Sequence, residues 1–222
     1  MRIKVCGLTT ATQFAELDDL GVDFGGFIFY PQSPRYVFNH LSTEDIRRLN
    51  GSKIHKVGVF VNETIDQLLK MVDECGINMV QLHGDETPHY CEKVAEHVTV
   101  IKAFRLRDED DVLWKIKDFK EVVDMFLFDT ATPAYGGSGK RFNWNILAGI
   151  SIDKPFLLSG GIGYDDVELI EQFLRNEVSK DLFAIDVNSK FELSPGIKNI
   201  SLIENFLQRM NSSLQFHSTV KI

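Results

Sequence analysis

Short apolar segments alternate with segments of helical periodicity along almost the whole chain. Eight continuous apolar runs are rich in the β-branched and aromatic residues that favour strands: 3–6, 24–29, 57–61, 79–82, 98–104, 125–129, 155–159 and 182–187. Because apolar and polar residues do not alternate within these runs, the runs are typical of parallel strands that are buried on both faces. The pattern therefore predicts eight parallel strands.

The segments between these strands carry helix signals. Apolar residues within 65–72 repeat at the spacing of one helix face, and Thr64 and Gly76 are placed to cap its two ends. Thr87 and Pro88 predict the start of another helix. Eight strand–helix alternations fit either a closed (β/α)8 barrel or an open doubly wound sheet, and the lack of signals for a second domain favours the barrel.

The chain length agrees with this choice, since β/α barrels often exceed about 200 residues as one domain and this chain has 222. We expect an α/β fold consisting of a single (β/α)8 TIM barrel over residues 1–210. A polar C-terminal tail, residues 211–222, is expected to follow it.

Composition and charge exclude several classes of protein. The formal net charge of −8 argues against nucleic acid as the main partner, because phosphate backbones need patches of Lys and Arg. No apolar run is long enough to cross a bilayer, and residues 1–5 begin as a strand rather than as a signal peptide. Cys6, Cys75 and Cys91 form neither a disulfide framework nor a zinc-binding spacing. These features predict a cytoplasmic protein without a membrane partner. The sequence leaves the oligomeric state open between a monomer and a homodimer.

Two residues at strand ends are candidates for proton transfer. The active site of a β/α barrel lies at the C-terminal ends of its strands, where Cys6 ends the first strand and Asp129 the sixth. Cys6 is either a small packing residue or a base, and as a base it would need a polarising site because a free thiol has a pKa of about 8.5. Asp129 either caps the following turn or acts as a general acid.

Loops after the seventh and eighth strands are candidates for phosphate binding, since barrels frequently bind phosphate there through backbone N–H groups. Gly160 and Gly161 follow the seventh strand and permit close backbone approach, although an ordinary turn would also use them. Asp186, Asn188 and Ser189 lie at and after the end of the eighth strand.

Three further polar residues are candidates for substrate binding. Arg35 lies in a proline-containing loop after the second strand, where a fixed guanidinium could bind a carboxylate or simply be solvated. Gln81 and His83 end the fourth strand and could reach the barrel mouth or satisfy backbone groups. The glycine-rich loop 131–141 has the composition of a mobile lid.

Taken in order, seven motifs and a following segment strongly resemble those of the phosphoribosylanthranilate isomerase family of tryptophan biosynthesis. They cover the chain from about residue 3 to about residue 210 and are specific in combination rather than singly. They are Val5-Cys6-Gly7-Leu8-Thr9, Pro34-Arg35-Tyr36, Gln81-Leu82-His83-Gly84, Phe128-Asp129-Thr130, Gly136-Gly137-Ser138-Gly139-Lys140, Leu158-Ser159-Gly160-Gly161 and Asp186-Val187-Asn188-Ser189, with Pro195-Gly196-Ile197-Lys198.

The resemblance implies a (β/α)8 barrel with no cofactor and no metal, acting on the small molecule phosphoribosylanthranilate. It implies that Asp129 protonates the ribose ring oxygen and that Cys6 removes the C2′ proton. Arg35 would hold the anthranilate carboxylate and Asp186 the sugar hydroxyls. The phosphate would be bound by the backbone of Gly160, Gly161, Asn188 and Ser189.

The chain departs from the family pattern after the eighth strand, where Lys190 stands in place of the usual glycine. Two other functions stay open. One is another phosphosugar isomerase barrel of the histidine-pathway type, in which a carboxylate would replace Cys6. The other is a barrel that binds a phosphorylated ligand without catalysis, but binding alone would require neither Cys6 nor Asp129.

Overall fold

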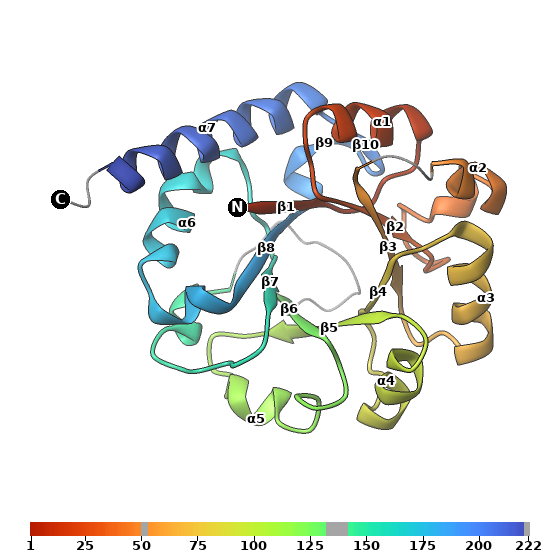
Figure 1. The fold of residues 1–222 in the computed structure, drawn as a ribbon, viewed down its shortest axis with the longest axis horizontal. Helices are drawn as coiled ribbons and strands as arrows, with labels where there is room; N and C mark the ends of the chain where they lie inside the picture. The colour runs from red at the N-terminus through yellow and green to blue at the C-terminus, as the bar shows by residue number, and fades with distance from the viewer. Residues whose placement is uncertain (50–52, 132–141, 220–222) are drawn as a thin grey trace.

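The computed structural model describes residues 1–49, 53–131 and 142–219 of the chain. Eight parallel strands close into a barrel in sequential order, so that β1 pairs with both β2 and β8 (Figure 1). The predicted (β/α)8 barrel is confirmed, and the open doubly wound sheet is excluded. The strands are β1 (Arg2–Val5), β2 (Phe24–Ile28), β3 (His55–Phe60), β4 (Met79–Leu82), β5 (Thr99–Leu106), β6 (Met125–Thr130), β7 (Phe156–Leu158) and β8 (Leu182–Val187).

Helices surround the barrel on the outside (Figure 1). Between β6 and β7 the described residues form only the short 3-10 helix η2 (Trp144–Leu147), so the alternation is less regular than the sequence pattern predicts. The α-helices are α1 (Ala11–Asp19), α2 (Thr43–Arg48), α3 (Ile65–Cys75), α4 (Pro88–Ala95), α5 (Val112–Ile116), α6 (Val167–Leu174) and α7 (Ile200–Thr219). The other 3-10 helices are η1 (Val37–Asn39), η3 (Tyr164–Asp166), η4 (Glu177–Asp181) and η5 (Ser189–Phe191), and a hairpin of β9 (Glu192–Ser194) and β10 (Ile197–Lys198) follows β8.

The predicted caps form. The Thr64 side chain accepts a hydrogen bond from the Gln67 amide at the start of α3, and Gly76 ends the helix in the left-handed region at φ 61°. Thr87 caps α4 in the same way by accepting from the Tyr90 amide. Local capping chemistry therefore sets where these helices begin and end.

Each strand divides its side chains between two cores, because successive side chains point to opposite faces. Ile3 and Val5 on β1 point outward into the large core that lies under the helices, whereas Lys4 points into the barrel. A second, smaller apolar cluster fills the lower interior of the barrel, comprising Phe24, Val57, Ile101, Ala103, Leu127, Leu157 and Ala184. Polar groups therefore gather above this cluster, toward the C-terminal ends of the strands.

The last helix, α7, lies beside α1 and α6 on the outside of the barrel (Figure 1). It runs through Met210 to Thr219, so the segment expected to be a tail begins as a continuation of this helix. The domain boundary at residue 210 stays a prediction. Among the described residues, no helix combines the length and apolarity needed to span a membrane.

Candidate active site

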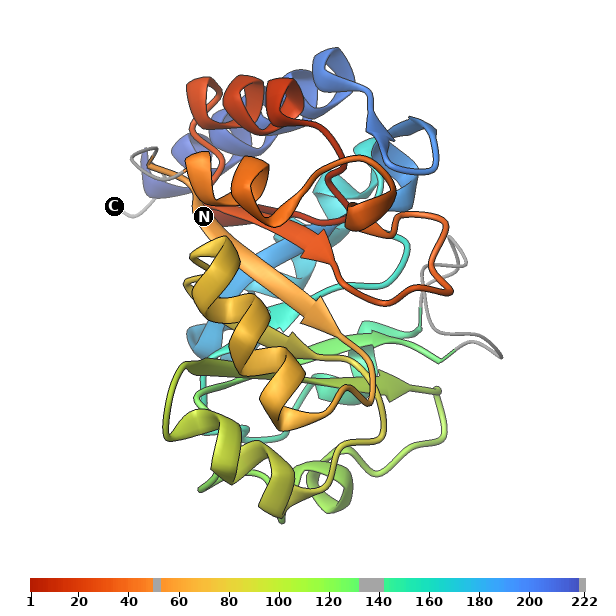
Figure 2. The same ribbon diagram turned by 90° about the vertical axis from the view of Figure 1, so that its right-hand side faces the viewer.

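One pocket opens at the end of the barrel toward which the strands point. In the side view of Figure 2 the strands point to the right. Its volume is about 680 Å³ including the open mouth, a size suited to a small metabolite. Nine of the ten residues predicted for the site line it, and Arg35 does not. The lining is Cys6, Ile28, Tyr30, Ser33, Val59, Val61, Gln81, His83, Asp129, Ser159, Gly160, Gly161, Ile162, Asp186, Asn188 and Ser189.

Cys6 continues the ladder of β1, with its amide donating to the carbonyl of Val187 at 2.9 Å. Its sulfur fills space that the missing side chain of Gly26 leaves on β2, since a Cβ at Gly26 would stand 2.9 Å from Sγ. The residue is only 4% exposed. Burial raises the pKa of the Cys6 thiol, while the ammonium of Lys4 acts in the opposite direction.

Asp129 ends β6 across the pocket. Its Oδ1 accepts a hydrogen bond from the Thr130 amide at 2.8 Å, as in the turn-capping interpretation, and its Oδ2 lies 3.3 Å from Nε2 of His83. Gly160 approaches this strand closely, because a Cβ there would lie 2.4 Å from the Thr130 hydroxyl. With φ at 93°, Gly160 also adopts a backbone conformation that side chains disfavour. The carboxylate thus keeps one oxygen toward the pocket.

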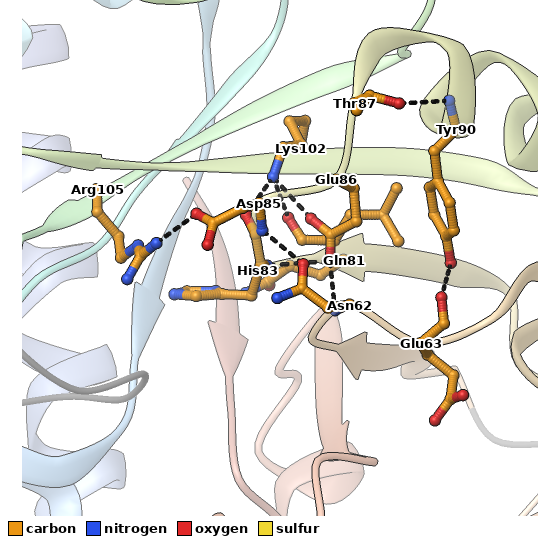
Figure 3. A network of polar contacts seen from close by, with 12 residues as sticks. Asn62, Glu63, Gln81, His83, Asp85, Glu86, Thr87, Tyr90, Lys102 and Arg105 are labelled. Carbon is orange, nitrogen blue, oxygen red and sulfur yellow. Dashed lines mark hydrogen bonds and ion pairs between the residues drawn. The ribbon is translucent and has the colours of Figure 1, made fainter.

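Gln81 and His83 form a side-chain pair on β4 and just after it (Figure 3). The Gln81 amide nitrogen lies 2.7 Å from Nδ1 of His83 and donates to it, so the ring proton belongs on Nε2, facing Asp129. Within the described residues, Oε1 of Gln81 and Nε2 of His83 are buried without an aligned hydrogen-bond partner. Buried polar atoms of this kind are candidates for ligand contact.

Asp186 lies beneath the pocket and is held from two sides. Its Oδ1 accepts from Nζ of Lys4 at 2.8 Å, and its Oδ2 lies 3.3 Å from the Ser159 hydroxyl. The side chains of Lys4 and Asp186 are 0% and 5% exposed. Burial disfavours the Lys4 ammonium, but Asp186 and Cys6 more than offset it, so the pKa of Lys4 is above its usual value.

The predicted phosphate loops meet at one side of the mouth. Gly160 and Gly161 both have positive φ angles, at 93° and 65°. Asn188 and Ser189 face them, and η5 begins at Ser189. Lys190 fits this 3-10 turn without a positive φ, so the departure from the family's glycine introduces no backbone strain.

Arg35 lies behind the pocket lining rather than on it. Its Nε donates to both carboxylate oxygens of Glu192 at 2.8 and 3.0 Å, and its Nη2 donates to Oε2 at 2.6 Å. Nζ of Lys198 donates to the same carboxylate at 2.7 Å and to Oδ1 of Asn188 at 2.8 Å. Despite burial, the two cations hold the pKa of Glu192 below its usual value.

Three charged residues at this site were not predicted: Lys4, Glu192 and Lys198. Lys4 carried a signal, because a lysine within a strand that is apolar on both faces needs a buried partner. The β9–β10 hairpin brings Glu192 to Arg35 and Lys198 to Glu192, and no local pattern in the sequence indicates these contacts. The glycine-rich loop 131–141, predicted to be a lid, lies from 132 to 141 outside the described residues. Among those residues, no group of three His, Cys, Asp or Glu side chains could hold a metal.

The chain matches a known family over nearly its whole length. The family model of N-(5'-phosphoribosyl)anthranilate isomerase matches residues 3–209. An enzyme of that name from Phocaeicola vulgatus is 39% identical over 216 residues, which cover 97% of this chain and 100% of the relative.

Solved structures agree in fold. The crystal structure of phosphoribosyl anthranilate isomerase from Thermotoga maritima superposes with a TM-score of 0.82 at 35% identity, covering 96% of this chain and 99% of that one. A further structure of such an isomerase, in complex with reduced 1-(o-carboxyphenylamino)-1-deoxyribulose 5-phosphate, gives a TM-score of 0.77 at 31% identity with the same coverage.

Proposed function

The chain belongs to the N-(5'-phosphoribosyl)anthranilate isomerase family of tryptophan biosynthesis, and from that premise we propose how its barrel mouth performs the isomerisation. The reaction is an Amadori rearrangement, in which an aldose amine becomes 1-(2-carboxyphenylamino)-1-deoxyribulose 5-phosphate. The observation that carries the proposal is that the Cys6 thiol and the Asp129 carboxyl line one pocket from β1 and β6. These strands stand three apart around the barrel, so an acid and a base can reach different parts of one sugar.

Asp129 acts first, as general acid. It donates a proton to the ribose ring oxygen as the bond from that oxygen to C1′ breaks, and the nitrogen lone pair forms the C1′=N bond of a protonated Schiff base. His83 stands beside the carboxylate at 3.3 Å and helps to hold it toward the pocket. The second oxygen of Asp129 stays fixed by the Thr130 amide.

Cys6 acts second, as general base in its thiolate form. The C2′–H bond breaks, the S–H bond forms, and the electron pair moves to make the C1′=C2′ bond of an enolamine while the C1′=N pair returns to nitrogen. The enolamine then tautomerises to the ketone. The sulfur is suited to this role because it lines the pocket at the end of β1, where a bound sugar would lie.

Binding groups surround this pair. We assign the sugar hydroxyls to Asp186, Gln81 and His83, whose buried polar atoms face the pocket. The phosphate is assigned to the backbone of the two loops described above, Gly160 with Gly161 and Asn188 with Ser189. Holding both ends of the substrate would place C2′ against the sulfur.

The carboxylate of the anthranilate ring is assigned to Arg35. Because Glu192 takes Nε and Nη2 of this side chain, the substrate would be met by Nη1. The bidentate pair fixes the plane of the guanidinium, which suits it to planar recognition of a second carboxylate. The substitution Arg35→Ala should therefore raise KM, and an unchanged KM would remove Arg35 from the carboxylate site.

We also propose a cytoplasmic location, no nucleic-acid partner, and a monomer or a homodimer. The supporting observation for the compartment is that Cys6, Cys75 and Cys91 are all buried and free, as in a reducing environment. The acidic net charge of −8 supports the absence of nucleic acid among the partners.

The test of the mechanism is kinetic. Cys6→Ser and Asp129→Asn should each lower kcat by roughly 10²- to 10⁴-fold, the usual contribution of a general acid or base. The affinity of the enzyme for its substrate should stay similar. Cys91→Ser is the matched control, because Cys91 is a buried cysteine of α4 away from the pocket, and it should keep wild-type kcat. Wild-type turnover in Cys6→Ser or Asp129→Asn would remove that residue from the mechanism. Failure of the intact chain to restore growth of a tryptophan auxotroph lacking this isomerase would overturn the function itself.

A further inference from the structure

Lys4 is the most deeply buried charge near the site, and neither the family motifs nor the binding roles above use it. It lies on the inner face of β1, directly opposite Asp186 in the ladder between β1 and β8. Its ammonium donates to Oδ1 of Asp186 at 2.8 Å. Its side chain is 0% exposed, so bulk water does not compensate its charge. Burying such a charge costs free energy, which a nearby group of opposite charge must offset.

Cys6 is two residues along the same strand, so its side chain points to the same inner face one pleat above Lys4. The Lys4 ammonium and the Cys6 side chain act on each other electrostatically, each favouring the charged form of the other. Gly26 leaves the space beside the sulfur clear of a side chain. The ammonium is thus a buried charge on the same inner face as the sulfur, one pleat away.

We propose that Lys4 is a positioning residue for the isomerisation, whose buried ammonium, paired with the Asp186 carboxylate on the same inner face as the Cys6 sulfur, stabilises the thiolate form of Cys6. This inference rests on the proposed role of Cys6 as the base. Burial alone would keep the thiol protonated, and a thiol cannot accept the C2′ proton. Lys4 provides the opposite charge at the place where the thiolate forms.

Other charged groups near the sulfur also favour or disfavour the thiolate form of Cys6. Asp186 on β8 disfavours the thiolate, and Lys198 on β10 favours it. Arg35, after β2, also interacts with Cys6, but Glu192 pairs with both Arg35 and Lys198. Arg35 and Lys198 therefore share the Glu192 carboxylate, whereas the charges of Lys4 and Asp186 neutralise each other. Across the mouth, Asp129 acts to raise the pKa of Asp186 and His83 acts to lower it.

Lys4 therefore differs from the other two cations in its partners. Lys198 is held by Glu192 and Asn188, and Arg35 is held by Glu192. Lys4 instead donates to Asp186, and it lowers the pKa of the Cys6 thiol more than Lys198 does. Removal of Lys4 should consequently shift the thiol titration more than removal of Lys198.

The experiment is a titration of Cys6 in a background carrying Cys75→Ala and Cys91→Ala, so that a single thiol remains. Thiolate is followed by its ultraviolet absorbance and by the rate of alkylation with iodoacetamide, each against pH. Lys4→Met should raise the titration midpoint of Cys6 by at least about one pH unit, a tenfold fall in thiolate at a given pH. The acidic limb of the kcat profile should move in the same direction, and Lys4→Arg should restore most of the shift.

Asp186→Asn should lower the midpoint, because it removes a carboxylate from the vicinity of the sulfur. Lys4→Met alone leaves that carboxylate buried without its partner and could prevent folding. The double variant Lys4→Met with Asp186→Asn removes both charges of the pair, so neither stays buried without its partner. Its Cys6 titration midpoint should exceed that of Asp186→Asn by at least about one pH unit.

Equal midpoints in the double variant and in Asp186→Asn would overturn the role of Lys4, whatever the activity of either protein. That result would leave the proposed mechanism intact if Cys6→Ser is inactive. Full activity of Cys6→Ser would instead overturn the role of Cys6. The two failures are therefore distinguishable.

Discussion

Two buried lysine–carboxylate pairs occupy different layers of the barrel. Lys4 and Asp186 meet inside it at 2.8 Å, and Lys102 and Glu86 meet outside it at 2.8 Å, between β5 and the loop that leads into α4 (Figure 3). Both pairs are almost fully buried. The alternation of side chains along β1 and β5 decides which pair faces the pocket and which faces the helices.

The neighbours of each pair determine what it does. Lys102 donates to the carbonyls of Leu82 and Gly84, and Glu86 accepts from the amides of Asn62 and Gly84. These partners are all backbone groups, so the outer pair fixes the path of the chain on both sides of His83. The inner pair instead has pocket-lining side chains as neighbours: Asp186 lies 3.3 Å from the Ser159 hydroxyl, and Lys4 acts electrostatically on Cys6. The same kind of ion pair thus has backbone neighbours in one layer and pocket-lining neighbours in the other.

The largest expected effect is on stability, in the outer layer. Glu86→Ala removes the carboxylate and leaves the Lys102 ammonium buried without its partner, which should lower the free energy of unfolding by about 3–5 kcal/mol. Urea unfolding followed by circular dichroism measures this loss. The pH dependence of kcat should stay that of the wild type, since neither charge faces Cys6. A shifted profile would contradict the separation of the two layers.

The next effect is on turnover, in the inner layer. Asp186→Asn should lower kcat/KM by roughly ten- to a hundredfold, because a hydrogen bond to a charged group contributes about 1.5–3 kcal/mol. Steady-state kinetics with the purified enzyme provide the measurement. Glu86→Gln is the matched control in the outer pair, and its kcat/KM should change far less. Comparable losses in both variants would mean that the two pairs are not functionally distinct.

A third lysine, Lys56, is buried against backbone carbonyls rather than a carboxylate, so it shows the effect of burial on a lysine pKa. It lies on the outer face of β3, where Nζ donates to the carbonyls of Ile46 and Cys75 at the ends of α2 and α3. Burial lowers the pKa of Lys56 from 10.5 to about 8. Between these two values the unfolded chain binds more protons than the folded protein, so this lysine makes stability rise with pH.

Comparison of the wild type with Lys56→Met therefore has a defined sign. The unfolding free energy of the wild type minus that of the variant should increase as the pH rises from about 8 to about 10.5. Denaturant unfolding at several pH values measures it. A difference that stays flat or falls across this window would show that burial does not disfavour the ammonium.

The smallest effect is expected at the surface. Lys70 and Glu74 form an exposed pair on α3 at 3.9 Å, with side chains 56% and 42% exposed. Lys70→Ala should change stability by no more than about 0.5 kcal/mol, because water screens such pairs. A loss as large as that of Glu86→Ala would mean that burial is not what separates these lysines.

The fold could be predicted because its signals are local and repeated. Eight apolar runs gave the eight strands, and capping residues such as Thr64 and Gly76 set helix ends. The lack of an α-helix among the described residues between β6 and β7 was not predicted, and neither was the continuation of α7 past Met210. Both depend on how side chains pack against the barrel, which periodicity does not report.

The site was only partly predictable for the same reason. Strand ends placed Cys6 and Asp129 near the mouth, because barrel topology fixes where strand ends meet. The pairing of Arg35 with Glu192 joins residues 157 positions apart. It depends on the turn geometry of the β9–β10 hairpin, and no spacing within the sequence encodes that contact. Whether the proposed site residues act as assigned stays a prediction.

Because Gln81 donates a hydrogen bond to Nδ1 of His83, the imidazole ring of His83 can report on the charge of its neighbour at the barrel mouth. A ring that accepts at Nδ1 and carries its proton on Nε2 has two clearly separated nitrogen resonances in NMR spectra, and a doubly protonated ring has nearly equal ones. Because Nε2 lies 3.3 Å from Asp129, these resonances would follow the charge on that carboxyl as a ligand enters. Isotope labelling of histidine alone would thus allow the protonation of the acid to be watched during turnover, without a label on the substrate.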